Sequence, residues 1–102
     1  MTRTAWKAHE RRTAQALGGQ RAGATGRDNA DIVGNERLTI ECKERKALPQ
    51  WLKDAVHQVL GYAENTDTLP IVVIHELGAR GDNDLVVMRR KDFVELLGGK
   101  NE

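Results

Sequence analysis

Two short apolar runs in the second half of the chain constrain its fold more than any other feature. Residues 69–76 read LPIVVIHE and residues 84–88 read DLVVM, so each run has the length of one strand. A continuous apolar run this short is typical of a strand that is buried on both faces. The polar stretch GARGDND between them, residues 78–84, predicts a turn. We therefore expect these two runs to be strands of one sheet, with other elements packed against both of its faces.

Three helices are predicted around these strands. The first spans residues 3–17, and Gly18-Gly19 ends it. Its stripe at helical spacing comprises Trp6, Glu10, Thr13, Ala14 and Leu17. The second helix spans residues 49–63 and opens with Pro49, since proline is favoured in the first helical turn. The third is short, residues 91–97, and stops at Gly98-Gly99.

The first half of the chain predicts three more strands, at residues 20–24, 30–33 and 37–43. Gly34-Asn35 joins the last two in a tight hairpin. The element order α-β-β-β-α-β-β-α predicts an α/β fold, a sandwich of helices around one central mixed β-sheet. A right-handed crossover would place the strand at 71–75 parallel to the strand at 38–43. We expect residues 1–97 to form a single domain and residues 98–102 a flexible C-terminal tail.

Composition limits the class of protein. The chain has 102 residues, of which 39% are hydrophobic and 30% charged, which is typical of one globular domain. The single cysteine, Cys42, excludes an internal disulfide and suits a reducing cytoplasm. No apolar run approaches the roughly 20 residues of a membrane span. A cytoplasmic protein is therefore expected.

Charge is unevenly distributed along the chain. Residues 1–53 contain eleven Lys/Arg and six Asp/Glu, whereas residues 54–102 contain five and nine. A basic half beside an acidic half is compatible with one face that meets a polyanion such as DNA. An ordinary solvated surface is the simpler interpretation.

Three carboxylates occupy positions that folding alone does not favour. Glu10 lies within the apolar stripe of the first helix, and Asp31 lies inside a short strand. Glu41 and Lys43 share the face of their strand opposite to Cys42, because side chains alternate along a strand. Asp31 and Glu41 belong to the two arms of one hairpin and can be neighbours across it.

Clustered carboxylates repel one another unless a cation lies between them. Oxygen ligands of this kind suit Mg²⁺, with Mn²⁺ as a substitute. Each charge also has a simpler interpretation. Glu10 could pair with Lys7 or Arg11 on the helix surface, Asp31 could belong to a turn, and Glu41 with Lys43 could form the polar face of an edge strand.

The stretch ADIVGNERLTIECK resembles the motif of the PD-(D/E)XK nuclease superfamily, with Asp31, nine intervening residues and then Glu41-Cys42-Lys43. Ala30 stands where the motif has proline. An earlier helix glutamate and a later helix glutamine also belong to that pattern, and Glu10 and Gln58 match them. The resemblance covers nearly the whole chain and implies a restriction-endonuclease-like three-layer core.

The resemblance also implies roles for these residues. Asp31, Glu41 and the main-chain carbonyl of Cys42 would hold Mg²⁺, and Glu10 would support a second metal or its water shell. Lys43 would orient or activate water, and Gln58 would steady Lys43 or that water. The side chain of Cys42 is expected in the core.

Among small members, the chain resembles Holliday-junction resolvases and resolvase-like endonucleases of phages. The resemblance implies DNA recombination, a homodimer and a location in the nucleoid or in a phage-infected cell. A phage or restriction-type endonuclease on duplex, nicked or flap DNA is an alternative. A non-catalytic DNA-binding module on the same fold, or a structural scaffold, is another.

Five basic residues flank the expected site in sequence and are candidates for phosphate contacts. They are Arg21, Arg27, Arg45, Lys46 and Lys53. Trp51 could stack on a base, although a core position is favoured. His57 and His75 give only a weak zinc signal without a cysteine pair, and a chain without serine offers no serine hydrolase triad.

Overall fold

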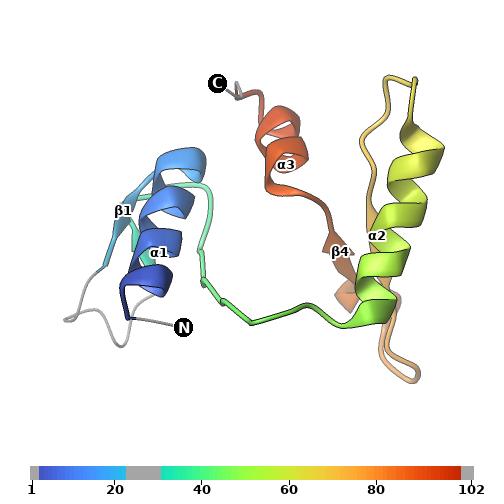
Figure 1. The fold of residues 1–102 in the computed structure, drawn as a ribbon, viewed down its shortest axis with the longest axis horizontal. Coiled ribbons are helices and arrows are strands. Elements are labelled where there is room, and N and C mark those ends of the chain that lie inside the picture. Colours follow the sequence, from blue (N-terminus) through green and yellow to red (C-terminus); the bar gives the residue numbers. More distant parts are fainter. Residues whose placement is uncertain (1–2, 23–30, 100–102) are drawn as a thin grey trace. The chain divides into compact units, whose positions relative to one another are not determined.

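A computed structural model of the chain describes residues 3–22 and 31–99. The protein divides into two compact units, Met1–Ala47 and Leu48–Glu102, which are described one at a time. The described residues form three helices and two small antiparallel sheets (Figure 1). The α/β class expected from the sequence is therefore confirmed. The central mixed sheet and the single-domain organisation remain predictions, and residues 100–102 of the expected tail lie outside the described part.

Helix α1, Arg3–Leu17, has the predicted bounds. Its alanine, arginine and glutamine residues favour helix, and most tertiary contact falls on one stripe. Glu10, Thr13 and Ala14 on that stripe are buried. Gly18 ends the helix with a φ of 96°, and its N–H donates to the carbonyl of Ala14 at 2.8 Å. A positive φ of this size favours glycine because a Cβ would meet the following carbonyl.

Strand β1, Gln20–Arg21, follows at once and pairs antiparallel with β2, Ile32–Val33. Ile32 is 3% exposed and forms the centre of this unit's core, where its burial contributes about 1.5–3 kcal/mol. A single antiparallel bridge joins Ile32 to Ile40, so the third strand predicted at 37–43 is reduced to one pairing. A Cβ on Gly19 would lie 2.6 Å from the carbonyl oxygen of Val33, which excludes any larger residue there.

Asn35 ties the turn after β2 to the end of α1. Its side-chain amide nitrogen donates to the carbonyls of Leu17 and Gly18, at 2.8 and 3.0 Å. Its side-chain oxygen accepts the backbone N–H groups of Arg37 and Leu38, at 2.9 and 2.8 Å. One side chain therefore satisfies orphan carbonyls at the helix terminus and also shapes the turn.

The second unit begins with helix α2, Gln50–Ala63, for which Pro49 is the N-cap residue with a φ of −54°. The prediction placed this start one residue earlier. The carbonyl of Pro49 accepts the N–H groups of Leu52 and Lys53, both at 3.1 Å. The chain leaves the helix at Asn65, which adopts a left-handed φ of 62°.

Strands β3, Val72–Ile74, and β4, Leu85–Val87, form an antiparallel hairpin with Val73 opposite Val86. The turn between them contains a short 3₁₀ helix, η1, Gly81–Asn83. Helix α2 lies along this hairpin (Figure 1). Val73 and Val86 are 56% and 60% exposed, and Val72, Ile74 and Val87 on the other face are only half-buried, so the burial expected on both faces is not observed.

Helix α3, Arg90–Leu96, is the last element of the unit. It begins and ends one residue earlier than predicted. Asp92 in its first turn is buried and suits the positive end of the helix dipole. The N–H groups of Gly98 and Gly99 donate to the carbonyls of Glu95 and Val94, both at 2.9 Å, which is a Schellman motif. Val94 is 8% exposed and supplies part of the unit's small core.

Candidate active site

The segment that carries the expected E-x-K motif alternates in burial. Residues 38, 40, 42 and 44 are half-buried, and residues 39, 41, 43 and 45 are exposed. This period of two is strand-like, although the backbone pairs only at Ile40. Cys42 therefore faces inward and Glu41 and Lys43 face outward, as the sequence predicts.

Glu41 and Lys43 form an ion pair on this outward face. Oε2 of Glu41 lies 3.3 Å from Nζ of Lys43, and the two side chains are 60% and 66% exposed. A pair this exposed contributes about 0–1 kcal/mol to stability. Folding therefore gives little reason for the pair, and both groups are accessible to a ligand from solvent.

Asp31 lies opposite this motif. The antiparallel bridge between Ile32 and Ile40 makes the next pair of positions Asp31 and Glu41. Oδ2 of Asp31 accepts the backbone N–H of Cys42 at 2.6 Å. The expected acidic neighbours on the two arms are thus brought together, and a charge-assisted hydrogen bond holds one of them.

Glu10 reaches this region from α1. It is 6% exposed, and Oε1 accepts a hydrogen bond from Nε of Arg21 at 2.7 Å. The surface partners considered from the sequence, Lys7 and Arg11, are therefore not its partners. Arg21 is one of the candidate DNA-binding residues, and its guanidinium also lies over the ring of Trp6, 5.5 Å from the ring centroid.

The pKa of the Cys42 thiol is affected by all three of these carboxylates. Burial raises the pKa of its thiol, and the carboxylates of Asp31, Glu10 and Glu41 raise the pKa further by repelling a thiolate. A hydrogen bond with Thr13 acts in the opposite direction and lowers that pKa. One strand residue thus lies within electrostatic reach of all three predicted carboxylates.

The chemistry of this donor set is compatible with a hard dication. Mg²⁺ takes one or two carboxylates, retains several waters and readily binds phosphate. Asp31 and Glu41, with the main-chain carbonyl of Cys42, make a set of that kind. Within residues 3–22 and 31–99, no three or more His, Cys, Asp or Glu side chains converge closely enough to hold an ion by side chains alone.

Gln58 and Lys53 belong to the second unit. Nε2 of Gln58 donates to the hydroxyl of Tyr62 at 2.8 Å on an exposed face of α2. Lys53 borders an apolar groove of about 260 Å³. The predicted roles of both residues beside Lys43 or DNA stay predictions. Trp51, for which a core position was favoured, is 58% exposed, so that expectation is wrong.

The other candidate DNA-binding residues lie close to the motif in sequence. Arg45 and Lys46 are exposed, and Nη1 of Arg45 bonds only locally, to the carbonyl of Glu44 at 3.2 Å. Arg27 lies outside the described residues.

The sequence indicated no role for Glu44 and only a turn position for Asn35. Oε2 of Glu44 is buried and has no hydrogen-bond partner among the described residues. A buried carboxylate oxygen without a partner is costly and therefore unusual. The motif ends at Lys43, so no pattern indicated Glu44, whereas Asn35 was considered only as a turn residue.

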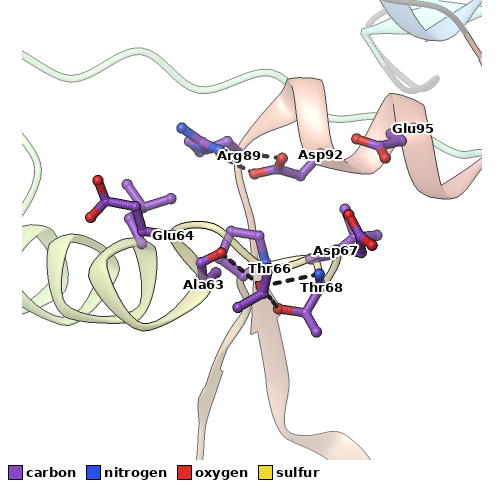
Figure 2. A pocket seen from close by; sticks show the side chains of 11 residues that line it. Ala63, Glu64, Thr66, Asp67, Thr68, Arg89, Asp92 and Glu95 are labelled. Carbon is purple, nitrogen blue, oxygen red and sulfur yellow. Dashed lines mark hydrogen bonds and ion pairs between the residues drawn. The ribbon is translucent and has the colours of Figure 1, made fainter.

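A second cleft lies within the other unit, between the end of α2 and α3 (Figure 2). Its volume is about 430 Å³, and its polar lining includes Glu64, Asp67 and Glu95. Arg89 neutralises Asp92 there through bonds of 2.8 and 3.3 Å, as Figure 2 shows. The cleft contains none of the residues predicted from the motif.

The weak zinc signal finds no support in the described part of the second unit. Nδ1 of His75 pairs with Oδ1 of Asp84 at 2.6 Å. His57 lies on α2 at the apolar groove, and neither histidine belongs to a ligand group.

Comparisons with family models, with curated proteins and with solved structures found no match to this chain. Of the described helices, none is both long enough and apolar enough to cross a membrane.

Proposed function

We propose that the protein is a Mg²⁺-dependent endonuclease that hydrolyses DNA phosphodiesters, with Asp31, Glu41 and Lys43 at its centre. The observation that carries the proposal is the pairing of Ile32 with Ile40, which sets the two carboxylates opposite one another. Lys43 lies 3.3 Å from Glu41 and adds an ammonium group at the same place. This combination is accessible to solvent and contributes little to folding.

Each residue has a proposed chemical role. Asp31, Glu41 and the carbonyl of Cys42 would hold Mg²⁺, which when bound neutralises phosphate charge and lowers the pKa of water. The ammonium of Lys43 orients the attacking water or stabilises developing negative charge on oxygen. Water adds to phosphorus, the bond to the 3′ oxygen breaks, and the products are a 5′-phosphate and a 3′-hydroxyl.

The proposed fold is the restriction-endonuclease-like three-layer core around one mixed sheet. The exposed apolar face of Val73 and Val86 supports it, because a strand pair that is apolar on both faces favours cover on both. A Holliday-junction resolvase must make two symmetric nicks, so the proposed assembly on branched DNA is a C2 homodimer.

The test is cleavage of a four-way junction and of a linear duplex of the same sequence, with Mg²⁺ and with EDTA. We expect nicking only with Mg²⁺ and faster on the junction. Lys43→Ala should lower the rate by more than about a hundredfold and leave DNA binding intact. Lys91→Ala, which removes an exposed lysine from α3, is the matched control and should cleave like the wild type.

Equal rates on junction and duplex would favour the alternative of a phage or restriction-type nuclease and remove the resolvase proposal. Cleavage that persists in Lys43→Ala would show that the proposed site is wrong.

A non-catalytic DNA-binding module is the second candidate. It is favoured by the fact that each carboxylate already has a partner within the chain: Glu10 has Arg21, Asp31 has the N–H of Cys42, and Glu41 has Lys43. DNA binding without any Mg²⁺-dependent cleavage would support this module instead.

A further inference from the structure

Helix α1 exposes a large aromatic side chain and buries polar ones. Trp6 is 42% exposed, whereas Glu10 and Thr13 on the same stripe are 6% and 7% exposed. Tryptophan is highly buried on average, and glutamate is seldom buried without a partner. Packing alone favours the opposite arrangement, with the indole inside and the carboxylate outside. The indole is therefore accessible to a ligand, and it contributes less to the core than its size allows.

A guanidinium holds this indole in a defined position. The guanidinium of Arg21 lies over the ring of Trp6, 5.5 Å from the ring centroid, which is a cation–π contact. Its Nε donates to Oε1 of Glu10 at 2.7 Å, and the side chain of Glu10 is 8% exposed. The buried carboxylate thus orients the guanidinium, and the guanidinium in turn covers part of the ring. We refer to Trp6 and Arg21 together as the platform.

The platform retains hydrogen-bond donors for a ligand. Arginine carries most of its N–H donors on its two terminal amino groups. Among the described residues, the hydrogen bonds of the Arg21 side chain use Nε alone. Because Nε is engaged by a buried carboxylate, the terminal amino groups are held in place and remain available. A planar group of this kind is suited to the oxygens of a phosphate.

The surface next to the platform is basic. Lys7 adjoins Trp6 in sequence, and Arg11 follows Lys7 one turn later on the same side of α1. Neither of these two cations has a carboxylate partner in the described part of the chain. Glu10 is the one acidic residue in the sequence of α1, and Arg21 neutralises it. The charge of this surface is therefore complementary to a polyanion.

An unpaired nucleotide of a single strand matches these groups. Its base has a flat aromatic face that stacks on an indole, and its phosphate binds a guanidinium. Proteins that bind single strands combine aromatic side chains with a cationic surface in this way. Within a duplex, the neighbouring base pairs cover that aromatic face. A single strand is therefore expected to bind more tightly here than a duplex of the same charge.

The platform lies on the face of the first unit opposite to the proposed catalytic group. Arg21 pairs with Ile32, and Ile32 pairs with Ile40, so these three side chains share one face. Asp31 and Glu41 each adjoin one of the two isoleucines in sequence and therefore point to the other face. Binding at the platform is thus separable from catalysis.

We propose that Trp6 and Arg21 form a binding site for single-stranded DNA. An unpaired base stacks on the indole of Trp6, the terminal amino groups of Arg21 bind a neighbouring phosphate, and Lys7 and Arg11 extend the contact along the strand. This inference goes beyond the proposed function and does not depend on it, because the platform contains none of the proposed catalytic residues.

Fluorescence anisotropy with a labelled oligothymidylate of about ten nucleotides tests the site, in EDTA so that no metal-dependent cleavage occurs. Trp6→Ala should weaken binding about tenfold, since stacking is lost, and Trp6→Phe should retain most of the affinity. Trp51→Ala removes the other tryptophan, which is 58% exposed on α2, and is the matched control with unchanged affinity. Equal losses in Trp6→Ala and Trp51→Ala would overturn the inference.

Fluorescence of Trp6 keeps the inference testable if Trp6→Ala fails to fold. The chain has two tryptophans, so Trp51→Phe leaves Trp6 as the sole indole. The oligothymidylate should quench its emission, and a hairpin duplex of equal charge should not. Quenching by the duplex at the same concentration, or no quenching by either DNA, would overturn the inference. Equally strong quenching by thymidine monophosphate would assign the site to free nucleotides and overturn its assignment to DNA.

The salt dependence of binding tests the role of Arg21. Loss of one phosphate contact to a single strand should reduce the slope of log K against log salt by about 0.7. The double variant Glu10→Gln with Arg21→Gln removes the buried pair as a unit, leaves no carboxylate unpaired and should show this reduction. Arg12→Gln, an exposed arginine on the side of α1 opposite to Glu10, is the matched control. An unchanged slope in the double variant would remove Arg21 from the proposed site.

The outcomes separate this inference from the proposed function. Tight binding of the oligothymidylate through Trp6, without cleavage of any DNA in Mg²⁺, would support the inference and overturn the nuclease proposal. Cleavage that depends on Lys43, without any effect of Trp6→Ala on single-strand binding, would do the reverse.

Discussion

The pKa of the Cys42 thiol depends on the charges of the candidate site. Because burial and three carboxylates raise its pKa, the folded protein favours the protonated thiol. The folded-state pKa lies above the unfolded value, so the associated stability is fully present at pH below the unfolded pKa. It is lost as the pH rises through the folded pKa. The same shift makes Cys42 a slow nucleophile near neutral pH, since only the thiolate reacts.

Alkylation by iodoacetamide measures this environment directly. The midpoint of its pH dependence should lie above that of an unfolded control peptide. Asp31→Asn keeps an oxygen that can accept the N–H of Cys42 but removes the charge, so the midpoint should move to lower pH. Glu36→Gln removes an exposed carboxylate that does not act on Cys42 and should leave the midpoint unchanged. An unchanged midpoint in Asp31→Asn would contradict the arrangement of charges described for the site.

The arrangement of α1, β1 and β2 in the first unit depends on two glycines and on the side chain of Asn35. Helix α1 and strand β1 are separated only by Gly18 and Gly19, so the chain reverses within two residues. Asn35 then fastens the turn after β2 to the end of the helix through four hydrogen bonds. This fastening positions the segment that carries Glu41 and Lys43.

Asn35→Asp isolates the two bonds that this side chain donates. An aspartate still accepts the N–H groups of Arg37 and Leu38 but cannot donate to Leu17 and Gly18, and it adds negative charge at the helix C-terminus. We expect a loss of about 2 kcal/mol in the free energy of unfolding, measured with urea.

Asn83→Asp, in the exposed turn η1, is the matched control for that measurement. It should change the free energy of unfolding by less than about 0.5 kcal/mol. Equal effects of the two substitutions would mean that the bonds to the end of α1 contribute nothing.

Across the protein, charge follows the division into units. Residues 1–47 contain ten Lys/Arg and six Asp/Glu, and residues 48–102 contain six and nine. A polyanion is therefore expected to meet the first unit, where Arg45 and Lys46 are exposed.

The salt dependence of DNA binding checks this expectation. Each phosphate contact that is lost should reduce the slope of log K against log salt by about 0.9. Arg45→Gln and Lys46→Gln should each show this reduction in a fluorescence anisotropy titration. Arg90→Gln, an exposed arginine of α3, should not. An equal reduction in all three variants would show that DNA has no preference for the first unit.

Local patterns predicted the helices well. The bounds of α1 agree with the sequence because a run of helix-forming residues followed by two glycines requires no distant partner. Strand bounds agreed less well. The 37–43 segment alternates in burial as predicted, yet it pairs only at Ile40, because a strand requires a partner backbone in register. Trp51 was misplaced because helical periodicity defines a stripe but does not define what covers it.

The amino-acid order alone was sufficient for the α/β class, the three helices and the acidic positions at 10, 31 and 41. These features depend on periodicity and on residue type, which act over a few neighbouring residues. Which charge meets which was settled by folding in three dimensions. Glu10 pairs with Arg21 eleven positions away, and Asp31 bonds to the N–H of Cys42, also eleven positions away. Such partners come together only when β1 and β2 fold against α1, because pair energies depend on distance in space and on burial.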